Sequence, residues 1–471
     1  MVKSSPEWRT PYASLSEDIF YARVSPQPLL NPRWVDVNQA LVSELDCLID
    51  FHQQDTLRAF SGGHPLHDWE PLAQVYSGHQ FGQWAGQLGD GRGLYLGVSG
   101  GYEWHLKGAG HTPYSRFGDG RSVLRSAIRE YLGSEYLHAL GIPTTRALAV
   151  VASDTPVQRE TTETGATLMR LAKSHLRIGH FEHFYHCHSH QHLREIAEFA
   201  IEQLDPDLSG ASDRMEIAFT RYVERSAKLV AGWMAVGFVH GVMNTDNTAL
   251  SGETLDYGPY GFVMAYRQDY VINHTDQTGR YAFGQQPRVM HWNLACLAET
   301  LTPFVDVETL GQILNDFPSQ YHQAFRSEMA RRLAIEPENE QLPSLIEAIQ
   351  RLWGNAGMHY PEVFVHLFDD SFVGLSEASG VDQSLDELRH LWSKETSSSL
   401  LNLARSQSPS WMLSHWLLDR VIQHAERGDY EPIRSLRQSM SNGLMNPSEM
   451  AAALGSSPPD GKSSYHLSCS S

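Results

Sequence analysis

Hydrophobic patterning divides the chain into a first part with strand and helix signals and a second part that is mostly helical. Apolar residues alternate over residues 94–98, a Ser-Gly-Gly turn follows, and residues 102–107 return, which predicts a β-hairpin. Apolar residues then recur at helical spacing from about Ser122 to Leu140, and Gly141 ends the pattern.

The order of the remaining signals predicts an α+β protein with two lobes. A small β-rich lobe with one key helix comes first, and a large helical lobe follows, so a cleft between them is a natural ligand site. The further expected elements are strands over 146–151, 167–171, 248–250 and 254–255, and helices over 217–239 and from 292 to about 454. The predicted organisation is an N-terminal extension packed on the core (1–60), a small lobe (61–178), a helical lobe (179–455) and a flexible tail (456–471).

Composition narrows the class of protein. The 471 residues are 41% hydrophobic, which is enough for a large core. Asp and Glu (55) outnumber Lys and Arg (36), and the net charge of −19 argues against general binding to nucleic acid or anionic membranes. A local basic pocket for a small anion remains compatible with that charge.

Cysteine usage and apolar runs indicate a cytoplasmic protein. The four cysteines form no CxxC pair and are too few for a disulfide scaffold. The N-terminus has no apolar signal-peptide region, and the longest apolar stretch, residues 229–239, is too short to span a membrane. We therefore expect a soluble monomer in a reducing compartment, without a membrane partner.

A glycine-rich run precedes the predicted hairpin. Gly86, Gly89, Gly91 and Gly93 could let backbone N–H groups approach a phosphate closely, or they could form a tight surface loop. No Gly-Lys-Ser/Thr follows, so the run is not a P-loop.

A lysine and a glutamate form a candidate buried pair. Glu130 lies on the same predicted helical stripe as Ala127 and Leu137, which face inward. A carboxylate on such a stripe needs a cationic partner, and Lys107 at the end of the hairpin is the natural candidate. The alternative is a solvated helix edge.

The sharpest signal is HGVMNTDN followed by DYG. In protein kinases the catalytic loop H-R-D-x-x-x-x-N is followed by D-F-G, and His240, Asn247 and Asp256 match that spacing. Amide and carboxylate oxygens suit Mg²⁺ held against nucleotide phosphates. Val242 stands where the kinase base would be, whereas Asp246 is a different carboxylate in the same loop. The pattern predicts a kinase-like ATP site without the usual base.

Other polar residues offer weaker signals. Arg92, Arg121, Arg170 and Arg177 could bind phosphate oxygens, although each alone is more typical of a surface arginine. Residues 180–192 contain six histidines and Cys187; a Zn²⁺ site is conceivable, but we favour a solvated loop.

Several long motifs resemble the selenoprotein O family of protein adenylyltransferases. They are YSGHQFGQWAGQLGDGRG, HLKGAGHTPYSRFGDGRSVLRSAIREYL, SHLRIGHFE, HGVMNTDN, DYGPYGF and GRYAFGQQP, and the resemblance covers about residues 60 to 320. It implies a protein-kinase-like fold once classed as a pseudokinase. It also implies that ATP binds in a flipped orientation and that AMP is transferred to Ser, Thr or Tyr hydroxyls of proteins, with Mg²⁺ or Mn²⁺ as cofactor. UMP transfer from UTP has been attributed to some bacterial members.

The resemblance also assigns roles residue by residue. Asp246 matches the proposed proton acceptor, Glu130 the helix partner of Lys107, and Asn247 and Asp256 the metal ligands. The matching nucleotide-binding residues are Gly89, Gly91, Arg92, Lys107, Asp119, Gly120, Arg170, Arg177 and Asp256.

Two other classes of function stay open. One is a catalytically inactive, nucleotide-binding scaffold. The other is a redox-responsive interaction protein acting through Cys469 in the tail, where family members carry selenocysteine or cysteine. No cysteine lies beside His274-Thr275-Asp276, which puts an internal disulfide in doubt.

Overall fold

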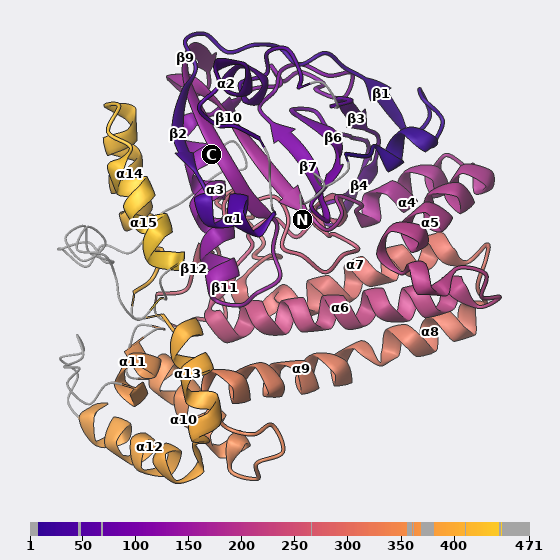
Figure 1. Ribbon diagram of the computed structural model, residues 1–471. Helices are drawn as coiled ribbons and strands as arrows, with labels where there is room; N and C mark the ends of the chain where they lie inside the picture. The colour runs from indigo at the N-terminus through magenta and orange to yellow at the C-terminus, as the bar shows by residue number, and fades with distance from the viewer. Residues whose placement is uncertain are drawn as a thin grey trace, which may run out of the picture.

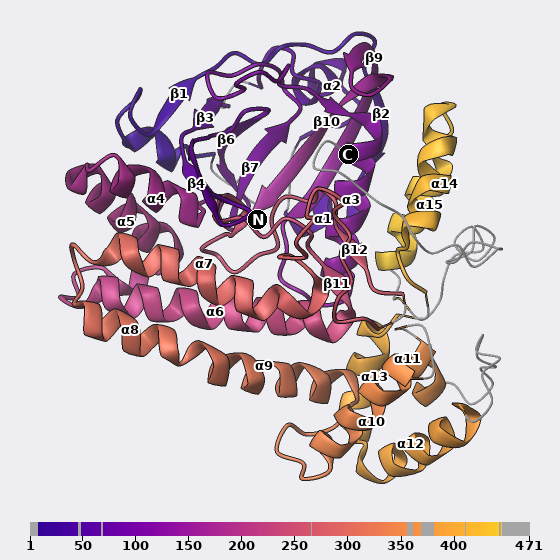
Figure 2. The same ribbon diagram turned by 180° about the vertical axis from the view of Figure 1, so that it is seen from behind.

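A computed structural model describes residues 8–45, 49–66, 69–264, 266–355, 360, 362–368, 381–409, 411–441 and 444. The first half of the chain builds an antiparallel sheet, and the second half builds layers of helices beneath it (Figures 1 and 2). Among the described residues, no helix combines the length and apolar character needed to cross a membrane. Cys469 and the predicted tail lie outside the described residues.

One sheet organises the first half of the chain. Its strands are β1 (Tyr21–Arg23), β2 (Arg33–Val37), β3 (Leu72–Gln74), β6 (Gly93–Ser99), β7 (Tyr102–Lys107), β8 (Ser122–Val123), β9 (Arg146–Gln158) and β10 (Thr162–Ala172). They run in the order β1-β3-β6-β7-β10-β9-β2, with β8 added beside β10, and all pairs are antiparallel. Two small ribbons pair β4 (Ser77–Gln80) with β5 (Gln83–Gln87) and β11 (Phe238–Val239) with β12 (Gly261–Phe262).

Helices cover the sheet and fill the second half. In the first half they are α1 (Gln39–Glu44), α2 (Gln54–Phe60) and α3 (Leu124–Ala139). The later helices are α4 (Ile178–His186), α5 (His190–Leu204), α6 (Arg214–Val236), α7 (Gln286–Leu301), α8 (Val307–Asn315), α9 (Phe317–Arg332), α10 (Leu342–Asn355), α11 (Glu362–Phe368), α12 (Val381–Glu395), α13 (Ser398–Gln407), α14 (His415–Glu426) and α15 (Glu431–Ser441). Short 3₁₀ helices are η1 (Pro11–Ser14), η2 (Pro206–Leu208), η3 (Thr245–Asn247) and η4 (Phe283–Gln285).

The two faces of the sheet belong to different hydrophobic clusters. Successive residues of a strand point to opposite faces, so Trp104 and Leu106 of β7 pack with Phe60 at the end of α2. On the other face, Ile128 and Leu132 of α3 pack in the larger cluster, and α3 contacts β9 and β10. Lys107 therefore lies on the face that α3 covers.

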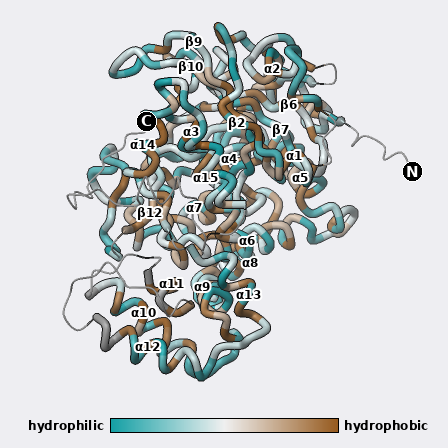
Figure 3. The backbone as a smooth tube through the Cα atoms, turned by 60° about the vertical axis from the view of Figure 1, so that its left-hand side comes forward, coloured by the Kyte–Doolittle hydropathy of each residue, from teal (hydrophilic) through white to brown (hydrophobic). Residues whose placement is uncertain are grey.

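The helical half packs around α6 and returns to the sheet at its end. α6 contacts both α7 and α9, and the hydropathy of the helices alternates along the chain, as expected for helices with one buried face (Figure 3). α14 and α15 pack against α3, and Arg437 of α15 pairs with the buried Asp36 of β2 at 2.5 Å. The C-terminal helices thus brace the helix that carries Glu130.

Most strongly periodic segments form the predicted elements. The hairpin over 94–107 is confirmed as β6 and β7, and the helix predicted over 122–140 is confirmed as α3, preceded by the short strand β8. The helix predicted over 217–239 ends earlier, at Val236, because Gly237 adopts φ 72° and caps it.

Two sequence expectations are wrong. The predicted strands at 248–250 and 254–255 are reduced to isolated bridges, such as Thr248 with Thr254. The histidine-rich segment 180–192 is not a solvated loop, because residues up to His186 form α4 and those from His190 begin α5. Burial lowers the pKa of His180 to about 3, so this histidine stays neutral and packs like a core residue.

Candidate active site

A polar cavity of about 580 Å³ lies where the sheet meets the loop after α6. Its volume suits a small-molecule ligand. It brings together all but one of the residues to which the family resemblance assigns a role: Gly89, Gly91, Arg92, Lys107, Asp119, Gly120, Arg170, Arg177, Asp246, Asn247 and Asp256. Glu130 is the exception, because it lies behind the wall and reaches the cavity through Lys107.

Asp256 is the centre of an ionic cluster on one wall. Its carboxylate oxygens lie 2.5 Å from Arg170 Nη1, 2.5 Å from Arg177 Nη1 and 3.4 Å from Lys107 Nζ. Burial would raise the pKa of Asp256, but Arg177, Arg170 and Lys107 outweigh burial and hold the pKa well below its usual range. Asp256 is therefore ionised at any working pH.

Glu130 completes the cluster from α3. Its carboxylate lies 2.5 Å from Lys107 Nζ and 3.4 Å from Arg170 Nη1. The predicted Lys107–Glu130 pair is thus present, and the solvated helix edge is ruled out because Glu130 is buried. Three cations face two carboxylates in this cluster, so one positive charge is left over beside the cavity.

The cavity as a whole carries a positive surplus. Its lining includes seven lysine or arginine side chains and four aspartates, in a protein whose net charge is −19. Arg170 and Arg177 are buried, contrary to the ordinary expectation for a single arginine, whereas Arg92 is exposed. Arginine guanidinium groups suit phosphate oxygens, so the cavity is built for an anionic ligand.

Two glycines that line the cavity lie too close to neighbouring atoms to carry a side chain. Gly89 has φ 139°, and a Cβ there would lie 2.5 Å from the ring of Tyr114. Gly120, from the facing loop, has φ 70°, and a Cβ there would lie 2.1 Å from the carbonyl oxygen of Gly110. Both positions therefore require glycine, and both expose backbone to the cavity.

Asp119 lies on the outer rim of the cavity. It accepts hydrogen bonds from Arg159 at 2.8 and 3.1 Å and from the backbone N–H of Arg121 at 2.9 Å. Burial opposes ionisation of Asp119, but these partners lower its pKa overall. Asp119 thus holds Arg159 and Arg121 at the entrance.

Asp246 lies in η3 and lines the cavity, and its backbone carbonyl accepts a hydrogen bond from Arg177 Nη1 at 2.8 Å. Burial raises the pKa of Asp246 to about 6. Its Oδ2 accepts a hydrogen bond from Gln80 Nε2 at 3.1 Å, whereas its buried Oδ1 has no hydrogen-bond partner among the described residues. A buried carboxylate with one open oxygen is suited to accept a proton from a ligand.

Two side chains of the loop around Asp246 hold it in place by hydrogen bonds to backbone carbonyls. His240 Nε2 donates to the carbonyl of Leu255 at 2.9 Å, which ties the loop to the segment carrying Asp256. Asn247 Nδ2 donates to the carbonyl of Val242 at 3.1 Å, which directs its amide oxygen to the other side. Val242 lines the cavity but has no group that could accept a proton.

A hydrogen-bonded network of Thr245, Glu182 and His79, here called the brace, supports Asp246 and lies outside the predicted site residues. Thr245 donates a short hydrogen bond to Glu182 Oε2 of α4 and accepts one from the backbone N–H of His79 at 2.7 Å. His79 Nδ1 in turn lies 2.6 Å from Glu182 Oε1. This network ties the residue before Asp246 to a buried helix.

Sequence reasoning missed the ribbon formed by β4 and β5. Gln80 contacts Asp246, and the backbone N–H of Phe81 donates to Asn244 Oδ1 at 3.1 Å. The polar sequence SGHQ is ordinary for an exposed strand, so it gave no signal of this contact. Its residues lie about 165 positions from the loop they contact, so no local pattern could pair them.

We predict that removing the hydroxyl of the brace lowers turnover. Thr245→Val leaves Glu182 Oε2 without its hydrogen-bond donor. A small displacement of a reacting group lowers the rate by up to about 10²-fold. We expect kcat to fall about 10-fold to 10²-fold while KM for ATP is unchanged, as measured by steady-state kinetics. Thr245→Ser keeps the hydroxyl and should restore turnover; equal loss in both variants would contradict a positioning role.

Comparison with known proteins agrees with this geometry. The family model described as Protein adenylyltransferase SelO matches residues 4–441. The chain is 42% identical to Protein nucleotidyltransferase YdiU of Enterobacter sp. (strain 638), over 96% of this chain and 97% of that one. It is also 42% identical to the protein of the same name from Cronobacter sakazakii (strain ATCC BAA-894), over 96% of each chain. This chain belongs to the SelO family of protein adenylyltransferases.

Proposed function

We propose that this protein transfers AMP from ATP to Ser, Thr or Tyr hydroxyls of proteins and releases pyrophosphate. The observation that carries the proposal is the pairing of a cation-rich wall around Asp256 with the open carboxylate oxygen of Asp246 in one cavity. The proposal includes a two-lobed, kinase-like fold, and the order of an antiparallel sheet with α3 followed by a helical part supports it.

In the proposed reaction ATP is seated in reverse. Lys107, Arg170 and Arg177 bind the β- and γ-phosphates, and Arg92 joins them from the exposed rim. The substrate hydroxyl oxygen attacks the α-phosphorus, the bond from that phosphorus to the bridging oxygen breaks, and pyrophosphate leaves. Asp246 accepts the hydroxyl proton. Positioning and charge stabilisation supply most of the rate enhancement.

A divalent cation, Mg²⁺ or Mn²⁺, fits the donor set of this cavity. Asp256 stays ionised, and Asn247 offers an amide oxygen. Hard oxygen donors of this kind suit Mg²⁺. Asn247 and Asp256 would hold the ion, which would neutralise phosphate charge when bound.

Val242 supports transfer of AMP over transfer of phosphate. An ordinary kinase needs a proton acceptor at this position, and valine offers none. With ATP reversed, the reacting phosphorus is the α-phosphorus, and Asp246 takes over proton transfer. UTP would place the same phosphates on the same cations, so UMP transfer belongs to the same proposal.

Isotopic labelling separates the possible activities. The protein is incubated with a protein substrate and ATP labelled at either the α- or the γ-phosphorus, with Mg²⁺ or Mn²⁺. We expect protein-bound label only from the α-position. Label only from the γ-position indicates a kinase, and ATP binding without label from either position indicates an inactive scaffold; both results overturn the proposal.

A further inference from the structure

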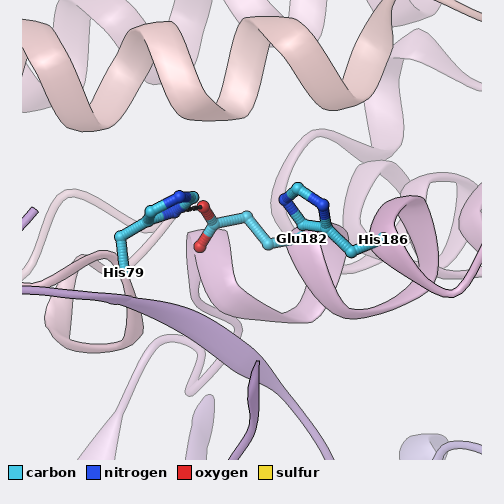
Figure 4. Close-up of side chains that lie close together, drawn as sticks. All are labelled: His79, Glu182 and His186. Atoms are coloured by element: carbon cyan, nitrogen blue, oxygen red, sulfur yellow. Dashed lines mark hydrogen bonds and ion pairs between the residues drawn. The ribbon is translucent and has the colours of Figure 1, made fainter. Parts of the chain in front are cut away.

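Outside the cavity, two histidines and a glutamate converge beside the β4–β5 ribbon. They are His79 of β4 and Glu182 and His186 of α4, and one ligand atom from each lies within 4.8 Å of the others (Figure 4). Glu182 and His186 are four residues apart, so they lie on the same side of α4. We propose that this cluster is a binding site for a divalent transition-metal ion of the zinc type.

The donor types select the class of ion. Two imidazole nitrogens and one carboxylate oxygen form a typical ligand set for Zn²⁺, and three protein ligands leave a fourth position for water. Mg²⁺ and Ca²⁺ prefer sites made only of oxygen. The cluster therefore differs in chemistry from the oxygen donors at Asn247 and Asp256.

Two of the three ligands are already oriented. Glu182 is almost fully buried, and its second oxygen accepts the hydrogen bond from Thr245. The backbone N–H of His79 is held by the same hydroxyl at 2.7 Å. Metal-binding carboxylates are commonly fixed by such outer hydrogen bonds.

The third ligand, His186, lies on the side from which a metal ion would enter the cluster. His186 is exposed at the end of α4, and its ring already places a nitrogen within 4.8 Å of the ligand atoms of the other two residues. Binding requires His79 Nδ1 and Glu182 Oε1, now 2.6 Å apart, to separate enough to admit the ion. The ring of His79 then carries its proton on Nε2, and Nδ1 donates its lone pair to the metal.

Two tryptophan rings pack against the histidines of the cluster. Trp84 packs on His186 with ring centroids 4.0 Å apart, and Trp292 packs on His79 at 5.4 Å. Since Trp84 and His186 are exposed, these rings flank the cluster and leave one side open to an entering ion.

Zinc titration of the full chain tests the proposal. Chelator-treated protein without nucleotide is titrated with ZnCl₂ by calorimetry. The wild type should bind one ion at this site, and His186→Ala should weaken binding by at least about 100-fold, since even outer-shell changes cost about 10–100-fold. His190→Ala removes an exposed histidine of the same segment that lies outside the cluster, so it should bind as the wild type does.

A second measurement reports the coordination geometry. Co²⁺ in place of Zn²⁺ should give the visible absorption of a tetrahedral site in the wild type and in His190→Ala, but not in His186→Ala. The ring contacts of His186 within the described residues are with His79, Trp84 and Tyr185, none of which lines the cavity, so AMP transfer with Mg²⁺ should be unchanged in His186→Ala. Equal zinc affinity in the wild type and His186→Ala, or equal weakening by His190→Ala, overturns the proposal.

Discussion

Replacement of Asp256 with asparagine should lower kcat for AMP transfer about 10³-fold. Loss of one preorganised group from such a site costs about 10²–10³-fold, and Asp256 orders Arg170, Arg177 and Lys107 at once. Without its carboxylate the three cations repel one another, and the site also loses the charged ligand proposed for the divalent cation. The measurement is the initial rate of label transfer from ATP labelled at the α-phosphorus.

Binding and stability measurements show where that loss arises. Asp256→Asn leaves buried cations less compensated, so its melting temperature should fall, and saturating ATP should recover part of it because phosphates replace the missing charge. The matched control is Asp269→Asn, which changes an exposed aspartate outside the cavity. If Asp256→Asn retains wild-type turnover, the ionic cluster does not serve the reaction.

Replacement of Asp246 with asparagine should lower kcat by about 10²–10⁴-fold, the usual contribution of a general base. The reason is specific to one atom: Asp246 Oδ1 is buried and has no hydrogen-bond partner in the described part of the chain. Asparagine keeps the shape and the possibility of contact with Gln80, but it cannot accept the hydroxyl proton. The affinity for ATP should change little, because asparagine keeps the backbone carbonyl of residue 246, to which Arg177 Nη1 donates at 2.8 Å.

The pH dependence of kcat/KM provides a second test of the role of Asp246. Burial raises the pKa of Asp246 to about 6, and only the ionised form accepts a proton. In the wild type, kcat/KM should therefore rise about tenfold per pH unit below pH 6 and level off above it. The residual activity of Asp246→Asn should lack this acidic limb. An identical limb in the variant would assign it to another group.

The local elements near the site were predictable because their patterns are short-range. Alternation over residues 94–98 and helical spacing from Ser122 specified β6 and α3, and the stripe of α3 placed Glu130 inward. The distance from His240 to Asn247 along the chain also indicated the loop that forms the floor of the cavity. These inferences need only residues that are near one another in sequence.

The structure of the histidine-rich segment could not be predicted from short-range patterns. Six histidines made residues 180–192 look solvated, because histidine is polar and close to its titration point in water. In the folded protein His180 is buried and neutral, and Glu182 contacts both His79 and Thr245. Those partners come from other parts of the chain, and no periodicity within the segment contains them.

The amino-acid sequence alone determined the types of the main elements, the family motifs and the absence of a proton acceptor at Val242, since each depends on residue identity and short spacing. Only the tertiary structure decided that Asp256 is shared by three cations, that one buried oxygen of Asp246 has no hydrogen-bond partner among the described residues and that Glu182 supports the loop carrying Asp246. Burial and charge pairing depend on contacts between residues that lie far apart in the sequence, such as Asp36 and Arg437 at a separation of 401 positions, and such contacts exist only after the chain has folded.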